Sequence, residues 1–149
     1  MPTVRVRDIM STELVTLAQE EDLSLADTIM SLARIRHLPV VRDGVLLGLV
    51  THRDILRAQL DRSRSFSQDQ AIKRAIKAGE IMTRKVTTVT PDTSLLAAAR
   101  LIRDQKLGCL PVVDGSDGRL VGLVTEADFV GFVIDALQGM QDPQGSSAG

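Results

Sequence analysis

The chain is poor in aromatic residues, with no Trp or Tyr and only 3 Phe among 149 residues. It therefore lacks the rings on which single-stranded bases stack. The formal net charge is −1, so the strongly basic surface typical of nucleic-acid binding is also absent. No apolar run approaches the roughly 20 residues that cross a bilayer. We therefore expect neither a nucleic acid nor a membrane as a partner.

Cysteine and histidine are scarce as well, with 1 Cys and 2 His. Cys109 cannot form an intrachain disulfide, and the N-terminus lacks the apolar stretch of a secretory signal, so we expect a cytoplasmic protein. Cys109 with His37 or His52 is the one conceivable nucleophile–base pair, but these residues belong to different copies of a repeat and are expected on opposite sides. Cys109 is better explained as a small buried hydrophobe. Neither Cys-x-x-Cys nor His-x-x-x-His spacing occurs, so we predict no catalytic residue and no metal site.

What the sequence does contain is an internal repeat. Three motifs occur twice: Ile-Met at residues 9 and 81, Leu-Pro-Val-Val at 38 and 110, and Gly-Leu-Val-Thr-x-x-Asp at 48 and 122. The offset grows from 72 (81 − 9) to 74 (122 − 48) because the second copy has two extra turn residues. Such self-similarity predicts two copies of one structural unit.

Each copy predicts the element order β-α-β-β-α. An extended stretch at 14–17 or 86–89 precedes a helix with Asp22 or Ser94 as its N-cap. The apolar runs 38–41 and 46–50 indicate two strands joined by a tight Asp43-Gly44 turn, because Asp and Gly tolerate positive φ. Thr51 or Thr125 then begins the closing helix. We predict an α/β (α+β) fold of two such units, packed sheet to sheet with pseudo-twofold symmetry, and clefts beside Gly48 and Gly122.

The predicted domain boundaries follow from these patterns. Residues 1–58 form the first unit, 59–78 a linker, 79–137 the second unit and 138–149 a disordered tail. The linker contains an amphipathic helix over 69–78, with Ala and Ile on one face and Lys and Arg on the other. A connector that packs on the core is the simpler interpretation of this helix. A surface for a partner or effector is the alternative.

In this order and twice over, the motifs resemble the CBS domain, and two in tandem resemble a Bateman module. The resemblance runs from about residue 6 to residue 135. It implies a regulatory sensor without catalysis or a required cofactor, whose two clefts bind AMP, ADP, ATP or S-adenosylmethionine. In similar proteins the Asp of Thr-x-x-Asp accepts hydrogen bonds from the ribose hydroxyls, which makes Asp54 and Asp128 candidate ribose ligands.

The resemblance also implies where the rest of the nucleotide lies. Candidate phosphate ligands are Thr51, Thr125, Arg34, Arg36, His37, His52 and Lys106. The candidate adenine pocket consists of Leu38, Pro39, Leu110 and Pro111. Most of these cations lie in the first copy, whereas Glu126 follows Thr125 in the second. We therefore expect the Thr51/Asp54 cleft to bind the more highly charged nucleotide.

Two alternatives stay open at this point. Thr-x-x-Asp is also a capping box with Asp in place of Glu, which needs no ligand. The chain could also act as a protein-docking regulatory subunit of a separate enzyme or transporter, without a tight small ligand. Similar pairs form homodimers, and the candidate contact is the apolar helix face Phe129, Phe132, Val133 and Leu137. An unidentified regulated protein is the further expected partner.

Overall fold

The computed structural model of the chain describes residues 3–62 and 69–141. A short helix η1 (Val6–Asp8) comes first, and the first unit then contains α1 (Leu23–Ala33), β1 (His37–Arg42), β2 (Val45–Thr51) and α2 (His52–Arg62). Two connecting helices follow, α3 (Asp69–Ala75) and α4 (Ala78–Ile81). The second unit contains α5 (Leu95–Gln105), β3 (Cys109–Asp114), β4 (Arg119–Thr125) and α6 (Glu126–Gln141). The predicted α/β (α+β) fold of two tandem units is confirmed.

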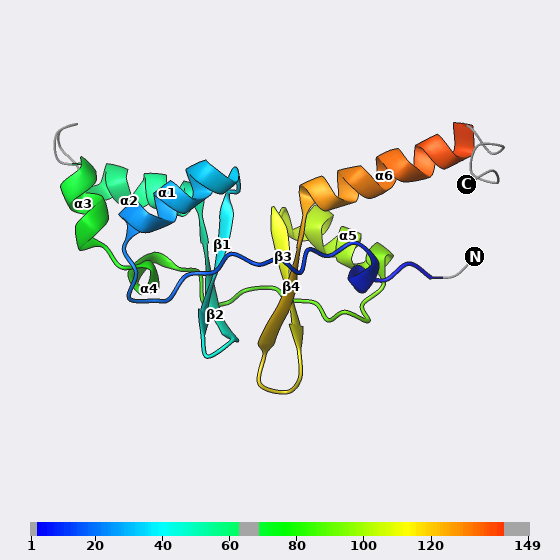
Figure 1. The fold of residues 1–149 in the computed structure, drawn as a ribbon, viewed down its shortest axis with the longest axis horizontal. Coiled ribbons are helices and arrows are strands. Elements are labelled where there is room, and N and C mark those ends of the chain that lie inside the picture. The colour runs from blue at the N-terminus through cyan, green and yellow to red at the C-terminus, as the bar shows by residue number, and fades with distance from the viewer. Residues whose placement is uncertain (1–2, 63–68, 142–149) are drawn as a thin grey trace.

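The two hairpins share one register. His37 pairs with Thr51 and Cys109 with Thr125, and each hairpin has its irregularity at the same place, after Val40 or Val112. The first turn is the tight one that was predicted, since Asp43 and Gly44 have φ values of 52° and 82°. The hairpins meet through one pairing of β2 with β4, between Val45 and Arg119. The resulting antiparallel sheet has the order β1-β2-β4-β3, with the helices of each unit on its outer side (Figure 1).

The opening strand predicted for each unit is reduced to a single bridge. Leu17 pairs in parallel with Val40, and Val89 pairs in the same way with Val112. Leu17 donates its N–H to the Pro39 carbonyl at 2.9 Å and accepts from the Val41 N–H at 2.9 Å. The next bond of this ladder would need an N–H from Pro39, which proline lacks. The second copy has the same restriction at its Pro111.

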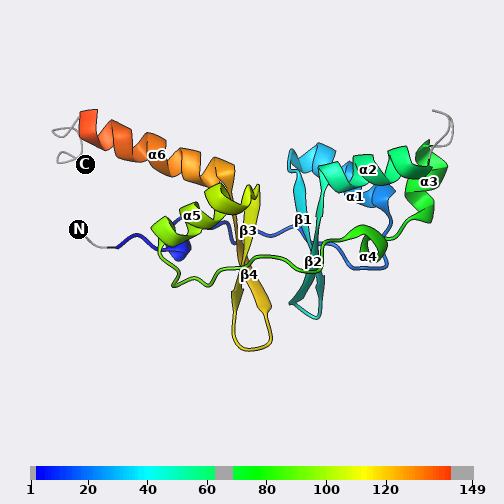
Figure 2. The ribbon, with the colours of Figure 1, turned by 180° about the vertical axis from the view of Figure 1, so that it is seen from behind.

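Each unit is packed with the opening segment of the other. Val6 is fully buried in the second hydrophobic cluster, beside Leu110, Val112 and Val124. Residues 76–82 contribute correspondingly to the first cluster, which also contains residues of α1, β1, β2 and α2. Figure 1 shows the blue N-terminal segment crossing from the second unit to α1 of the first unit, and Figure 2 shows the green segment after α4 crossing from the first unit to the second. The two units are therefore held together by an exchange of segments.

The two strand glycines do not leave clefts, which corrects that expectation. A Cβ on Gly48 would lie 2.7 Å from the Met82 sulfur and 2.8 Å from the Thr83 carbonyl oxygen. A Cβ on Gly122 would lie 2.7 Å from the Met10 sulfur. The repeated Ile-Met motif therefore fills the space that each glycine leaves open. These glycines allow close approach of a crossing segment.

The linker packs on the first unit. Ile76 and Ala78 are fully buried, and the Lys73 ammonium lies 2.5 Å from the Asp27 carboxylate of α1. These contacts favour the connector interpretation, although the helix ends at Ala75 and a new one begins at Ala78. The α6 helix continues to Gln141, so the first four residues of the predicted tail are helical, because Gln and Met support a helix there. Residues 63–68 of the linker and 142–149 of the tail lie outside the described residues. Among the described helices, none has the length and apolar character needed to cross a bilayer.

Candidate functional site

A cavity of about 740 Å³ lies where the two units face each other. From the first unit it is lined by the start of β1, the end of β2 and the first turn of α2. From the second unit it is lined by the end of α5, the start of β3 and Glu126, together with the incoming segment 83–87. The charged or titratable side chains of this lining are Arg36, His37, His52, Arg53, Lys85, Lys106, Cys109 and Glu126.

Left-handed residues at the ends of two helices bring the strands to this cavity. Arg34 follows α1 with φ 56°, and Lys106 follows α5 with φ 55°. A backbone bond then joins each strand entry to its closing helix. The Arg36 carbonyl accepts from the His52 N–H at 2.9 Å, and the Gly108 carbonyl accepts from the Glu126 N–H at 3.1 Å. The same local geometry therefore places repeat-equivalent residues at one cavity.

His37 spans the boundary between the units. A Cβ on Gly108 would lie 2.5 Å from His37 Nε2, so the imidazole rests on the backbone of the second unit where a side chain is missing. Burial lowers the pKa of His37 below its ordinary value of 6.5, against the opposing influence of the Glu126 carboxylate. Arg36 lowers the same pKa further, and Asp54 raises it. The imidazole is therefore neutral at neutral pH.

The cavity carries an excess of positive charge. Arg36, Arg53, Lys85 and Lys106 are cations, whereas Glu126 is the one carboxylate among the described residues that line the cavity. Two of these cations come from the first unit, and Lys85 and Lys106 come from the second unit and the segment leading into it. Clustered charge of one sign in a recess attracts ligands of the opposite sign. The arrangement favours an anion.

Both Thr-x-x-Asp motifs form capping boxes, as one interpretation predicted. Asp54 Oδ2 accepts from the Thr51 N–H at 2.9 Å, and Thr51 Oγ1 accepts from the Asp54 N–H at 3.2 Å. Asp128 Oδ2 accepts from the Thr125 N–H at 2.8 Å. The N–H groups of Thr51, His52 and Asp54 are thus already bonded, so an anion at this end of α2 would be held chiefly by side chains.

The two Thr hydroxyls differ in one respect. The Thr125 hydroxyl lies 3.2 Å from Asp128 Oδ2 and donates to it. The Thr51 hydroxyl only accepts, from the Asp54 N–H, and within the ranges 3–62 and 69–141 its hydrogen has no acceptor. Thr51 also lines the cavity. It can therefore donate a hydrogen bond to a bound anion, whereas the hydrogen of Thr125 is already used.

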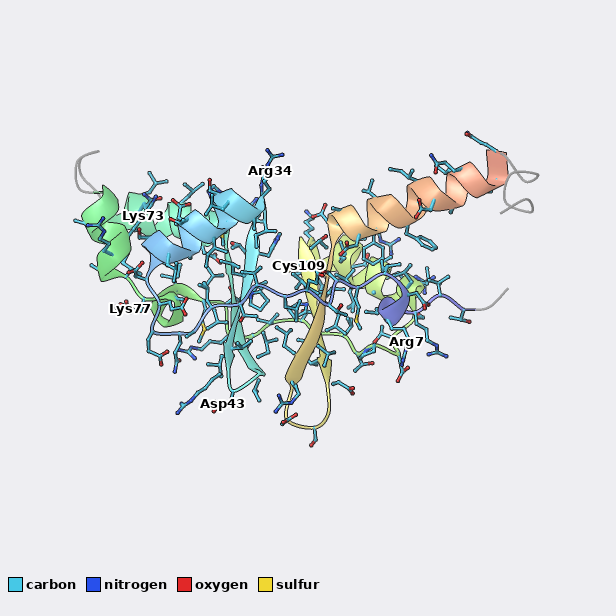
Figure 3. All side chains as sticks on the ribbon, viewed as in Figure 1. Arg7, Arg34, Asp43, Lys73, Lys77 and Cys109 are labelled. Atoms are coloured by element: carbon cyan, nitrogen blue, oxygen red, sulfur yellow. The ribbon has the colours of Figure 1, made fainter. Side chains whose placement is uncertain are left out.

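The structure brings together five of the predicted ligand residues: Arg36, His37, Thr51, His52 and Lys106. Thr125, Asp128 and Asp54 do not line this cavity; Asp54 lies instead beside a smaller hollow of about 200 Å³ with Arg57 and Asp61. Arg34 is absent from the lining too, and Figure 3 shows it at the end of α1, directed away from the sheet.

The residues predicted to surround adenine are core residues. Leu38 and Leu110 are fully buried, and Pro39 and Pro111 are buried beside them. The apolar side chains on the cavity are Leu49, Leu56, Val86 and Leu107. Sequence reasoning missed Lys85 and Val86, whose signal is their place three to four residues after the repeated Ile-Met. The corresponding positions of the first copy carry no positively charged residue.

Cys109 and the two histidines line the same cavity, which corrects the expectation of opposite sides. Repeat-equivalent residues meet near the pseudo-twofold axis, and Figure 3 shows Cys109 near the centre of the molecule. Burial raises the pKa of Cys109 to about 12. The thiol is therefore protonated at neutral pH and is a poor nucleophile. Within the described part of the chain, no three His, Cys, Asp or Glu side chains converge as a metal site would require.

Comparison with known families identifies both halves of the chain. The family model described as CBS domain matches residues 6–61 and again residues 78–135. Inosine-5′-monophosphate dehydrogenase of Mycobacterium tuberculosis is 38% identical over 123 residues, which are 81% of this chain and 21% of the enzyme. The chain thus spans about a fifth of the dehydrogenases that it matches.

Solved structures match over nearly the whole chain. The AcuB protein of Vibrio cholerae is 34% identical with a TM-score of 0.79, covering 95% of this chain and 98% of that one. CBSX2 in complex with AMP is 27% identical with a TM-score of 0.75, covering 89% and 98%. The CBS domain pair of protein MJ0100, in complex with 5′-methylthioadenosine and S-adenosyl-L-methionine, is 31% identical with a TM-score of 0.72, covering 94% and 99%.

Proposed function

The chain belongs to the CBS domain family, and from this premise we propose that it is a regulatory module that binds an adenine nucleotide and catalyses no reaction. One observation carries the proposal, namely the cavity of about 740 Å³ in which four permanent cations meet the Thr51 hydroxyl. Its volume is typical of small-molecule sites, which measure about 300–1,000 Å³. The AMP bound to CBSX2 supports an adenine ligand.

The charge of the cavity supports a ligand with several phosphate charges. Arg36, Arg53, Lys85 and Lys106 would face the phosphates, and the Thr51 hydroxyl would donate to one of their oxygens. The aliphatic side chains of the lining would cover the adenine ring. We therefore rank ATP and ADP above AMP, and all three above S-adenosylmethionine, because the sulfonium of that ligand adds a positive charge.

Asp54 keeps its predicted role at the ribose as part of this proposal. Its capping bond uses Oδ2, and among the described residues no hydrogen bond uses Oδ1. A carboxylate oxygen can accept two hydroxyl donors. The charge of Asp54 also reaches His37 on the cavity, which places the two side chains within electrostatic range. Asp128 and Thr125 would serve a second, weaker site.

Calorimetry with ATP, ADP, AMP and S-adenosylmethionine tests the proposal. We expect saturable binding whose affinity decreases in that order. High salt should weaken the binding, because the phosphate contacts are electrostatic. A thermal shift should accompany binding, since a ligand at a hundred times its Kd stabilises the folded state by about 2.7 kcal/mol. Absence of heat and of a thermal shift with all four ligands would contradict the proposal and favour the docking alternative.

A specific observation supports protein contact as well. The α6 helix has no buried residue, and five of its large apolar residues are exposed: Val130, Val133, Ile134, Leu137 and Met140. Of the face predicted for dimer contact, Val133 and Leu137 belong to this exposed set, while Phe129 packs on the second core. We propose that α6 contributes to a homodimer, and light scattering of Val133→Asp against the unmodified chain would test it. A cytoplasmic location belongs to the same proposal.

A further inference from the structure

The contact between His37 and Gly108 carries an inference about how the cavity responds to pH. The imidazole occupies the place that a Gly108 side chain would take, with Nε2 only 2.5 Å and Cε1 2.8 Å from that position. The ring is half buried and lines the cavity together with the cationic residues. A proton added to this ring would place a further charge at the boundary between the two units.

Charged groups surround the ring from every element packed against it. Arg36 directly precedes it, just before β1 begins, and the carboxylates of Glu126 in α6 and Asp54 in α2 lie within electrostatic range. The remaining titratable or charged groups on the cavity are His52, Arg53, Lys85, Lys106 and Cys109. Without a ligand, burial is the largest influence on the ring and disfavours its protonated form; Arg36 adds to this effect, and Glu126 and Asp54 oppose it. A protonated imidazole is therefore unfavourable there.

A phosphate group reverses this balance. It brings negative charge into a partly buried recess, and an opposite charge within about 4–6 Å favours the protonated form of a histidine. We propose that His37 takes up a proton from the solvent when a phosphate-bearing ligand enters the cavity, so that the ligand binds more tightly at mildly acidic pH. This inference rests on the proposed function, since it concerns the same cavity. The step forms one N–H bond on the imidazole with a proton from the solvent, and no other covalent bond changes.

The chain offers a direct measurement, because its only 2 histidines both line the cavity. The two imidazoles can be titrated by NMR in the whole chain, with and without saturating ATP, and assigned with His37→Asn and His52→Asn. We expect the midpoint of His37 to lie below 6.5 without ATP and to rise when ATP is bound. His52 serves as the matched control, since it lines the same cavity and its side chain is not the one resting on Gly108.

The binding affinity gives a second readout. Between pH 7.5 and pH 5.5 we expect the ATP affinity of the unmodified chain to rise at least about threefold relative to that of His37→Asn measured in parallel. The ratio removes the titration of ATP itself. The inference is overturned if ATP perturbs the His52 resonance while the His37 midpoint stays fixed. If ATP changes neither resonance and gives no heat, the proposed function fails and the inference falls with it.

A second variant tests the contact without removing the imidazole. Gly108→Ala places a methyl group against the ring, so the ring must move away from Gly108. We expect the His37 midpoint of this variant to move up toward 6.5 without any ligand, because the ring loses part of its burial. An unchanged midpoint in a folded Gly108→Ala protein would show that the Gly108 contact does not control the proton, and would overturn the inference.

Discussion

The two units share one backbone and differ in the residues that they place at the cavity. Their hairpins have the same register, and α1 and α5 are each followed by a left-handed residue at the equivalent position. At the cavity, however, the positions of Arg36, His37, His52 and Arg53 in the first unit are taken in the second by Gly108, Cys109, Glu126 and Ala127. Apolar spacing, proline and glycine fix the fold in both copies. The polar ends of the strands are free to diverge.

This difference has a chemical consequence because equivalent ends meet at one site. The first unit brings Arg36, Arg53 and the available Thr51 hydroxyl. The second unit brings Lys106 and the space beside Gly108 into which His37 fits. A duplicated fold has thus produced one composite cavity rather than two equal ones. The predictions below test how far the two units are unequal.

The largest expected difference concerns the strand glycines. In Gly48→Ala the new methyl group meets the Thr83 carbonyl at 2.8 Å, whereas in Gly122→Ala the nearest backbone oxygen, that of Ser11, is 3.2 Å away. Each carbonyl is held by a backbone N–H at 3.0 Å, Thr83 by Leu49 and Ser11 by Leu123, so the expected difference rests on the shorter contact at Gly48. We expect Gly48→Ala to lower the free energy of unfolding by about 3 kcal/mol and Gly122→Ala by about 1 kcal/mol.

Urea unfolding of both variants measures these losses. Gly131→Ala is the control, because nothing lies within 4 Å of its added Cβ and alanine favours a helix. That variant should be as stable as the unmodified chain or more so. Equal losses at the two strand glycines would show that the crossing segments are equally tight.

The next prediction compares the two left-handed residues that end α1 and α5. Arg34→Gly and Lys106→Gly should each raise stability by up to about 1 kcal/mol, because glycine adopts this conformation without strain. Only Lys106 lines the cavity. We therefore expect Lys106→Gly to weaken ATP binding about tenfold, by loss of a charged contact, and Arg34→Gly to leave it unchanged. Calorimetry measures the ATP affinity of both variants. An equal loss of affinity would show that Arg34 contacts the phosphates after all.

A smaller effect separates the two capping threonines. Thr51→Val and Thr125→Val each remove a cap, so each should lower the free energy of unfolding by about 1 kcal/mol. ATP affinity should fall about fivefold in Thr51→Val alone, because the Thr125 hydrogen already bonds to Asp128. Thr51→Ser, which keeps the hydroxyl, should restore the affinity. A loss of ATP affinity in Thr125→Val of the same size would contradict the unequal roles of the two threonines.

Much of the fold was predictable from local patterns. The strand pair, the Asp43-Gly44 turn and the N-caps Asp22 and Ser94 all follow from residue types within one copy. The shortening of the opening strand could also have been predicted, since Pro39 visibly lacks a donor. The filling of Gly48 by Met82 could not, because it depends on a segment that crosses from the other side of the repeat.

The site was predictable only in part, for the same physical reason. The first-unit residues Arg36, just before β1, and Thr51, at the end of β2, were found because they are close in sequence to the repeated motifs. That Lys85, Lys106 and Glu126 join them depends on how two units pack, which no pattern within one unit records. The position of the pseudo-twofold axis is likewise not recorded in one unit, and for this reason the expectation that Cys109 and the histidines lie on opposite sides was wrong. Packing between copies decides which ends meet.

The smallest expected effect is the contribution of His37 to stability without ligand. Because its folded pKa lies below 6.5, the unfolded chain binds more protons than the folded chain between those two pKa values. The free energy of unfolding should therefore be highest above pH 6.5 and decrease as the pH falls through that window. Replacing the imidazole in His37→Asn should flatten this decrease, whereas His52→Asn should retain it. Urea unfolding at a series of pH values measures the slopes, and a slope that survives in His37→Asn would assign the proton to another group. Cys109, the equivalent residue of the second unit, stays protonated throughout, so this dependence belongs to the first unit alone.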